Sequence, residues 1–283
     1  MKEVVLCEHA GFCFGAARAV ETLEKELDSK EPIYTFGPIL NNARLVKDFS
    51  LKGVRVIENI EDFKDLKKGK IIIRSHGVSK EIYEGLESTG FEIIDATCPF
   101  VKRIHEIVSK RSEMGERIVV IGNPEHPEVK GIVGWSKTGA VVLETKEDVL
   151  KFVKNKPENL CIVSQTTFNR IKFQEFLDIF EKNSYNTYVS NTICDATRIR
   201  QSESEELSRR ASVFIVIGDP KSSNSRKLYD ICKANCSQTF FIQTVDDIKG
   251  KIPEECGLIG ITAGASTPKY IIEEVQNYVK YGF

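Results

Sequence analysis

The sequence has no run of eighteen apolar residues, and its first apolar run, Val4–Leu6, is too short for the core of a secretory signal. We therefore expect a cytoplasmic protein with no membrane partner. A surplus of one charge is missing as well, since 40 basic residues face 41 acidic ones and the formal net charge is −1. Such a balance predicts no general attraction to nucleic acid or anionic lipid. An anionic ligand would have to be held by local groups.

The eight cysteines form no compact C-x-x-C run, and no low-complexity linker divides the chain. Scattered thiols in a reducing compartment are more often buried, metal-binding or catalytic than bridged, so we do not expect disulfides. The chain has 283 residues, 41% of them hydrophobic, and can bury roughly three quarters of its unfolded surface. These properties indicate a globular protein.

What the sequence does contain is an alternation of short apolar runs with longer segments of helical period. This pattern is typical of βαβ units and mostly parallel sheets, so the expected fold class is α/β. The expected strands include 4–7, 70–74, 91–95, 117–122, 140–144, 159–164, 212–218, 239–243 and 257–262. The expected helices include 16–27, 80–88, 100–113, 172–182 and 268–281.

Polar residues follow five of these strands, in the segments RSHGVS, IGNPEHPEV, SQTTFN, GDPKSSNS and ITAGASTP. Ligands of open parallel sheets collect beyond the carboxyl ends of the strands, so these segments could converge on one site. The alternative is that their polar residues are helix N-caps, which we expect for Ser79 and Thr267.

Three cysteines lie beside small or turn-forming residues at the start of a helical segment: Cys13 in GFCFG, Cys98 in DATCPFV and Cys194 in NTICDAT. Similar stretches of chain separate them, which suggests three similar α/β segments with one thiol each. Cysteines at helix N-termini ligate metal as thiolates. Three thiolates on a [4Fe–4S] cluster would leave one iron without a protein ligand. The spacing alone also allows a Cys₃His zinc site or buried structural cysteines.

The other five cysteines favour a place in the core. Cys232 and Cys236 are four residues apart on an expected helix and would share one face. Cys7, Cys161 and Cys256 lie in or near apolar strands. None of the five is expected to bind metal.

Eight motifs occur in one order over essentially the whole chain: GFCFG, RSHGVS, DATCP, HPEV, SQTT, NTICDAT, KSSNS and ITAGAS. In these motifs the sequence resembles the 4-hydroxy-3-methylbut-2-enyl diphosphate reductase family, the last enzyme of the methylerythritol phosphate route to isoprenoids. The resemblance implies three similar α/β domains in a pseudo-threefold arrangement around a central cavity. It also implies a [4Fe–4S] cluster held by Cys13, Cys98 and Cys194. We place the domains at 1–97, with the N-terminal strand, 98–193 and 194–283.

The resemblance further implies an oxidoreductase that removes an allylic hydroxyl with two electrons and two protons, giving isopentenyl and dimethylallyl diphosphate. It makes Glu128 of HPEV the proton source and Thr166 of SQTT the residue that relays or orients the proton. Without the resemblance, Glu128 would be interpreted as a solvated carboxylate after a turn proline. The diphosphate would be held by residues at matching motif positions, namely His76, His126, Ser222, Ser223, Asn224 and Ser266. The electron donor would be a protein such as ferredoxin or flavodoxin.

One position departs from the family pattern. Where the family has Gly-Pro-Ile-x-His-Asn, this chain has GPILNN, so Asn41 replaces the expected diphosphate-binding histidine. An asparagine can donate a hydrogen bond but carries no charge. Two alternatives follow: a paralogous [4Fe–4S] reductase with a different allylic or unsaturated substrate, which Asn41 favours, and a non-catalytic iron–sulfur sensor. Glu128 and Thr166 argue against the sensor, which needs no proton relay.

Overall fold

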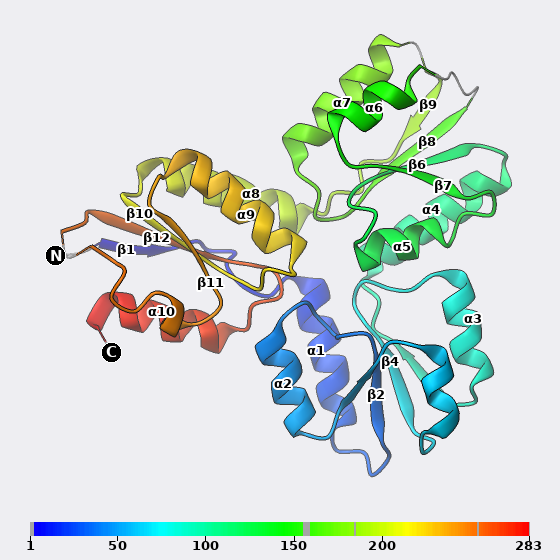
Figure 1. Ribbon diagram of the computed structural model, residues 1–283, viewed down its shortest axis with the longest axis horizontal. Coiled ribbons are helices and arrows are strands. Elements are labelled where there is room, and N and C mark those ends of the chain that lie inside the picture. Colours follow the sequence, from blue (N-terminus) through cyan, green and yellow to red (C-terminus); the bar gives the residue numbers. More distant parts are fainter. Residues whose placement is uncertain (1–2, 155–158, 184, 254, 283) are drawn as a thin grey trace. The chain divides into compact units, whose positions relative to one another are not determined.

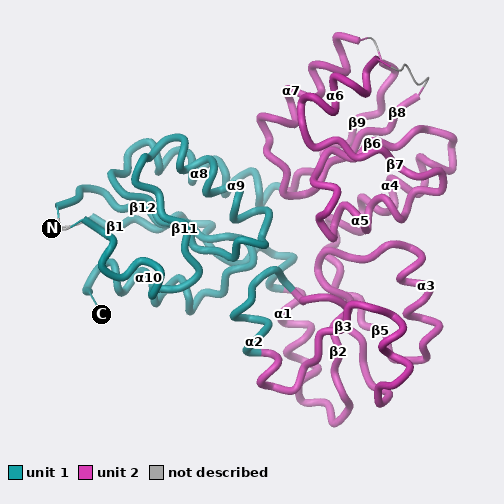
Figure 2. Tube along the Cα trace, viewed as in Figure 1, with its two compact units in different colours: residues 1–17, 40–48, 195–283 teal, residues 18–39, 49–194 magenta. Residues whose placement is uncertain are grey.

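The structure is a computed structural model that describes residues 3–154, 159–183, 185–253 and 255–282 (Figure 1). The described chain contains three four-stranded sheets in which every pair of neighbouring strands is parallel. The expected α/β class is therefore confirmed. By its contacts the chain divides into two compact units, one of residues 1–17, 40–48 and 195–283 and the other of residues 18–39 and 49–194 (Figure 2).

Two of the sheets belong to the larger unit. One has the order β3-β2-β4-β5, with β2 (Ile33–Phe36), β3 (Arg55–Ile57), β4 (Lys70–Ile73) and β5 (Glu92–Asp95). The other has the order β7-β6-β8-β9, with β6 (Arg117–Ile121), β7 (Ala140–Leu143), β8 (Leu160–Ser164) and β9 (Thr187–Val189). The sheet of the smaller unit has the order β1-β12-β10-β11, with β1 (Glu3–Leu6), β10 (Val213–Ile217), β11 (Thr239–Ile242) and β12 (Leu258–Ala263).

The three sheets repeat one order of elements. From β2 the chain runs through α2 (Ala43–Leu51), β3, a 3₁₀ turn η1 (Ile60–Asp65), β4, α3 (Lys80–Ser88), β5 and α4 (Pro99–Glu113). From β6 it runs through α5 (Pro127–Val133), β7, α6 (Lys146–Phe152), β8, α7 (Arg170–Lys182), β9 and α8 (Asp195–Arg210). The third copy begins with β10, α9 (Ser223–Asn235), β11, η2 (Val245–Asp247), β12 and α10 (Lys269–Tyr281), and β1 and α1 (Phe14–Glu26) complete it from the N-terminal end of the chain.

The N-terminal strand is the exception to the predicted division of the chain. We placed it in the segment 1–97, but Glu3 pairs with Leu258 and β1 lies in the sheet of the C-terminal segment. A run such as Val-Val-Leu fits the edge of any buried parallel sheet, because its pattern carries no information about its partner. The boundaries at 97/98 and 193/194 stay a prediction.

The central strands carry β-branched residues on both faces, and each face packs into its own hydrophobic core. In β6, Val119 and Ile121 belong to one core cluster, while Ile118 and Val120 belong to another on the opposite face. All four side chains are fully buried. Continuous apolar runs of this kind are typical of parallel strands covered on both sides.

The two N-cap predictions have different outcomes. The Ser79 hydroxyl accepts the N–H of Ile82 at 3.3 Å and caps α3, as predicted. The prediction for Thr267 is wrong, because its hydroxyl donates to the Ile217 carbonyl at 3.2 Å and Pro268 occupies the N-cap position of α10. Thr267 is 1% exposed, and the hydrogen bond to Ile217 provides its buried hydroxyl with a partner.

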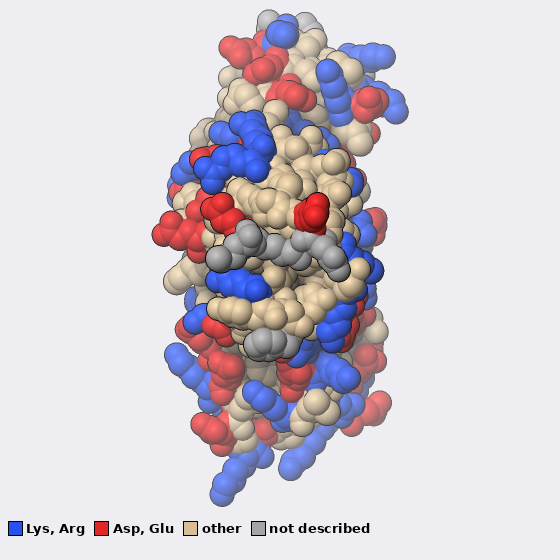
Figure 3. All heavy atoms as spheres, turned by 90° about the vertical axis from the view of Figure 1, so that its left-hand side faces the viewer, with Lys and Arg blue, Asp and Glu red and all other residues tan. Residues whose placement is uncertain are grey.

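On the face drawn in Figure 3, acidic and basic side chains are interspersed. None of the helices in the described ranges has the length and apolar character needed to cross a bilayer.

Candidate functional site

The three predicted cysteines occupy the same position in the three copies of the fold. Each follows the edge strand of its sheet, β1, β5 or β9, and directly precedes a helix. Each is half-buried. Cys13 lies in the smaller unit, while Cys98 and Cys194 lie in the larger one. The repeat inferred from sequence spacing thus corresponds to a repeat of local structure.

The backbone of each cysteine is held in the same way. The N–H of Cys13 donates to the Ala265 carbonyl at 3.3 Å, that of Cys98 to Ser75 at 2.9 Å, and that of Cys194 to Thr166 at 3.1 Å. Each acceptor follows the strand next to the edge strand, so the loop after β12, β4 or β8 fixes one cysteine. The same three loops contain three predicted site residues, Ser266, His76 and Thr166.

The sulfur of Cys13 lies at the start of α1. The backbone N–H of Ala16 points to Cys13 Sγ at 3.4 Å. The first N–H groups of a helix have no partner within the helix, so this N–H can point at the sulfur.

Four other cysteines have a different environment. Cys7, Cys161, Cys232 and Cys236 are buried in apolar clusters, as the sequence predicted. Burial raises the pKa of the Cys161 thiol to about 12, and burial also raises the pKa of Cys7 and Cys232. The thiols of Cys7, Cys161 and Cys232 therefore remain protonated at neutral pH and are poor metal ligands. Cys256 is half-buried and packs beside the core of the third sheet.

Arg200, a residue that the sequence analysis did not single out, holds the loop of Cys13 from α8. Its side chain is 2% exposed and donates from Nε to the His9 carbonyl at 2.9 Å and from Nη2 to the Gly11 carbonyl at 2.8 Å. Gly11 has φ of +97°, a conformation that favours glycine. No local pattern signals these contacts, which join residues 191 and 189 positions apart.

We expect Arg200→Lys to lower the free energy of unfolding by about 2 kcal/mol, because a lysine cannot make both charge-assisted bonds to the two carbonyls. Arg198→Lys is the matched control on the same helix, since Arg198 is exposed and its ion pair is with Asp195, three residues away, at 3.2 Å. A pair of that kind contributes less than about 1 kcal/mol. Urea unfolding of both variants measures the difference. Equal midpoints for the two would show that Arg200 does not stabilise the loop.

Glu128 and Thr166 are in direct contact. The Thr166 N–H donates to Glu128 Oε1 at 2.6 Å and the Thr166 hydroxyl donates to Oε2 at 2.8 Å. Glu128 is only 2% exposed, so the alternative of a solvated carboxylate is wrong. The first turn of α5 positions the carboxylate, and the loop after β8 supplies both donors. Such an arrangement can hold a carboxyl group in one orientation toward a reacting group.

His76 and His126 lie beside each other in the same unit. Their ring centroids are 5.2 Å apart and the rings are perpendicular. Nδ1 of His126 accepts the Glu128 N–H at 3.2 Å and caps α5, so that nitrogen carries no proton. Nδ1 of His76 is buried and has no hydrogen-bond partner among the described residues, and burial, with His126 and Arg74 nearby, holds the pKa of His76 well below its usual 6.5. An anion beside these rings would supply the missing partner.

The smaller unit contains the other predicted binding residues. Ser222 caps α9 by accepting the Ser225 N–H at 3.4 Å, and Ser223 and Asn224 follow in the first turn. Asn224 is 3% exposed, and neither polar atom of its side-chain amide has a hydrogen-bond partner within the ranges that the structure describes. A buried amide without partners costs free energy unless a ligand satisfies it.

Asn41 and Ser266, which are 225 positions apart in the sequence, are hydrogen-bonded to each other. The Ser266 hydroxyl donates to the Asn41 carbonyl at 3.0 Å. The Asn41 side chain is half-buried and makes no hydrogen bond within the described part of the chain. It therefore remains available to a ligand.

The comparisons with known proteins agree with this architecture. The LytB protein family matches residues 4–280, and the chain belongs to this family. A 4-hydroxy-3-methylbut-2-enyl diphosphate reductase of Caldanaerobacter subterraneus subsp. tengcongensis is 44% identical over an alignment of 282 residues that covers 98% of this chain and 96% of that protein. A reductase of the same name from Alkaliphilus oremlandii is 41% identical over 278 residues, covering 96% of this chain and 97% of that protein. By this membership the chain is an enzyme of the oxidoreductase class.

Two solved structures have the same fold. The structure of an (E)-4-hydroxy-3-methyl-but-2-enyl diphosphate reductase, described as the terminal enzyme of the non-mevalonate pathway, is 37% identical with a TM-score of 0.72 and covers 99% of both chains. The E-1-hydroxy-2-methyl-but-2-enyl-4-diphosphate reductase of Plasmodium falciparum is 30% identical with a TM-score of 0.90, covering 99% of this chain and 87% of that one.

Proposed function

We propose that this protein reduces 4-hydroxy-3-methylbut-2-enyl diphosphate to isopentenyl and dimethylallyl diphosphate, using a [4Fe–4S] cluster held by Cys13, Cys98 and Cys194. The reaction consumes two electrons and two protons, breaks the allylic C–O bond and releases the hydroxyl as water. The observation that carries the proposal is the threefold repetition of one half-buried cysteine at one place in the fold. The names of the relatives support the substrate.

The donor set fits such a cluster. Three thiols lie at helix starts, and burial keeps the thiols of Cys7, Cys161 and Cys232 protonated, so the three thiols at helix starts are better suited to ligate iron. Bound there, the cluster would supply electrons one at a time and a Lewis-acidic iron without a protein ligand. The electrons would come from a one-electron carrier of the ferredoxin or flavodoxin kind.

Glu128 would supply a proton to the departing hydroxyl. A hydroxide is a poor leaving group, so a positioned acid lowers the barrier to breaking the C–O bond. The two hydrogen bonds from Thr166 fix the orientation of the carboxyl group, and the Thr166 hydroxyl can reverse its direction when the carboxyl is protonated. Thr166 therefore acts by orienting the acid.

The diphosphate would be bound by neutral hydrogen-bond donors and by the start of α9. The unsatisfied amide of Asn224 and the Ser222 hydroxyl, which acts as an acceptor within the helix cap and keeps its own proton, are suited to phosphate oxygens. His76 and His126 would add ring N–H donors. This composition agrees with a chain of nearly zero net charge.

Steady-state kinetics on the allylic diphosphate, with anaerobically purified protein and a strong artificial reductant, tests the proposal. We expect turnover to both isopentenyl and dimethylallyl diphosphate. An intact cluster without detectable turnover would reject this substrate and return the choice to a paralogous reductase or a sensor.

Asn41→His is expected to lower KM about fivefold with little change in kcat. A protonated histidine adds a charge-assisted hydrogen bond to the diphosphate, stronger than a neutral one by about 1 kcal/mol. The contact is remote from the breaking C–O bond, so it acts equally on the ground and transition states. Kinetics of both proteins measure the effect. A pocket shaped around Asn41 for another substrate would instead lose its native activity in the histidine variant.

A further inference from the structure

We infer that Asn42 and Asp219 are positioning residues that join three diphosphate-binding loops of the smaller unit into one hydrogen-bonded assembly, which we call the loop clasp. The inference rests on the proposed function for the identity of the ligand. The clasp consists of Asn42, Asp219 and Ser266 with the backbone groups that they bind. All three residues lie in the unit of residues 1–17, 40–48 and 195–283.

The segment 40–48 belongs to a different compact unit from the residues that flank it in the sequence. The residues on either side of it belong to the larger unit, but the segment itself belongs to the smaller one. It contains Asn41 and the start of α2, so contacts with the loops after β10 and β12 decide where Asn41 lies.

Asn42 makes two contacts of opposite kind. Its Oδ1 accepts the Leu45 N–H at 2.9 Å and caps α2, while its Nδ2 donates to the Ser266 carbonyl at 2.9 Å. Because one partner is a donor and the other an acceptor, the orientation of the amide is defined. Ser266 returns the contact through its hydroxyl, which donates to the Asn41 carbonyl at 3.0 Å. The loop before α2 and the loop after β12 are thus joined by two hydrogen bonds, one donated from each loop.

Asp219 connects the third loop. Its Oδ2 accepts the Ala43 N–H at 2.9 Å and its Oδ1 accepts the Lys221 N–H at 2.8 Å. One carboxylate therefore spans the start of α2 and the segment that leads into Ser222. The side chain is 6% exposed. A carboxylate near a diphosphate site repels the ligand by its charge. We therefore infer that Asp219 contributes through its two charge-assisted hydrogen bonds to the backbone.

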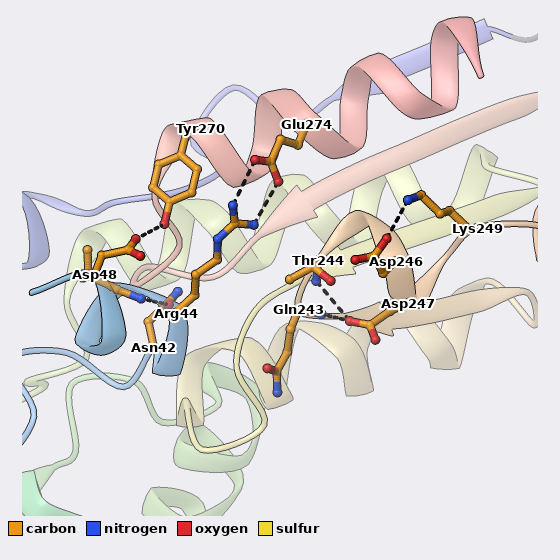
Figure 4. A network of polar contacts seen from close by, with 11 residues as sticks. Asn42, Arg44, Asp48, Gln243, Thr244, Asp246, Asp247, Lys249, Tyr270 and Glu274 are labelled. Atoms are coloured by element: carbon orange, nitrogen blue, oxygen red, sulfur yellow. Dashed lines mark hydrogen bonds and ion pairs between the residues drawn. The ribbon is translucent and has the colours of Figure 1, made fainter. Parts of the chain in front are cut away.

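A second set of contacts joins the same helix, α2, to α10 (Figure 4). Arg44 donates two bonds to Glu274 at 2.9 and 3.1 Å, and the Tyr270 hydroxyl donates to Asp48 at 2.8 Å. Burial and Asp48 raise the pKa of Tyr270 to about 12, so its hydroxyl remains a donor at neutral pH. These contacts join α2 to α10 without touching the three loops.

The clasp would set the affinity for the diphosphate. Asn41, Ser222 to Asn224 and Ser266 come from three separate loops, and ordering them only when the ligand binds would cost conformational entropy. The clasp orders them beforehand. Because these residues lie away from the breaking C–O bond, disturbing the clasp should raise KM and leave kcat nearly unchanged.

The test uses calorimetric binding of inorganic pyrophosphate to the cluster-containing protein, with KM and kcat measured beside it. Asn42→Ser keeps a capping oxygen for α2 but cannot reach the Ser266 carbonyl. Asp219→Asn removes a negative charge and places an amide N–H against one backbone N–H. We expect each to weaken pyrophosphate binding about tenfold. Tyr270→Phe is the control and should bind like the parent protein.

Asp219→Asn separates two explanations by the sign of its effect. If Asp219 acts only through its charge, its loss would tighten pyrophosphate binding, and that result would overturn the clasp. The clasp predicts weaker binding, with a raised KM and an unchanged kcat.

Amide hydrogen exchange of the ligand-free protein tests, independently of the reaction, whether the clasp orders the three loops. Asn42→Ser should accelerate exchange in all three segments 41–45, 219–224 and 264–267. Acceleration confined to 41–45 would refute the clasp. If the parent protein has protected loops but does not bind pyrophosphate, the proposed substrate fails while the exchange result still decides the clasp.

Discussion

Turnover should fall by a factor on the order of 10² or more in Glu128→Gln, while the fold and the substrate affinity are retained. The substitution is isosteric, and its amide fits the two contacts that the carboxylate makes with Thr166. The Gln oxygen can accept the Thr166 N–H, and the Gln N–H can donate to the Thr166 hydroxyl, which then acts as acceptor. What the variant loses is a dissociable proton at that position.

Glu125→Gln is the matched control for this prediction. Glu125 is three residues earlier in the chain, is exposed and pairs with Lys130 at 2.7 Å. Its substitution should leave kcat unchanged. Steady-state kinetics and iron content of both variants measure the outcome. Near-parental kcat in Glu128→Gln would show that another group delivers the proton.

The second large effect concerns the cysteines. Cys13→Ser, Cys98→Ser and Cys194→Ser should each lose most of the brown chromophore of anaerobically prepared protein, because each thiolate anchors one of only three ligated irons. A serine hydroxyl deprotonates much less readily than a thiol and is a poor replacement. Visible absorbance and iron per protein measure the loss.

Two controls separate ligation from damage to the fold. Cys232→Ser alters a buried thiol between α8 and α9, and Cys256→Ser alters a half-buried one that does not precede a helix. Both should retain the chromophore. Equal loss in the Cys232 variant, or a colourless protein that binds zinc instead, would contradict the assignment of ligands.

Much of the fold could be predicted from hydrophobic pattern. Runs such as RIVVI of β6 and VFIVI of β10 are buried on both faces, and their length and β-branched composition identify them as central strands. The strands β2, β3 and β9 were missed. IYTF of β2 has a threonine among four buried residues, and RVI and TYV are three-residue edge strands with exposed positions. Such short runs do not stand out from loops.

The sequence could not reveal contacts made across the whole chain. Asn42 meets Ser266 at a separation of 224 residues, Asp219 meets Ala43 at 176, and Arg200 meets Gly11 at 189. Adjacent residues give no signal for such pairs, and asparagine or aspartate in a turn has local explanations of its own. The motif positions, by contrast, were visible because their residue types and order are unusual.

Mössbauer spectroscopy can identify the cluster and its ligands in protein purified anaerobically from cells grown on isotopically enriched iron. We expect one [4Fe–4S] cluster per chain, with three similar irons and a fourth distinct iron whose signal alone changes when the allylic diphosphate is added. Four equivalent irons that do not respond to this substrate, or a protein that holds no iron under these conditions, would rule out a cluster with three cysteine ligands.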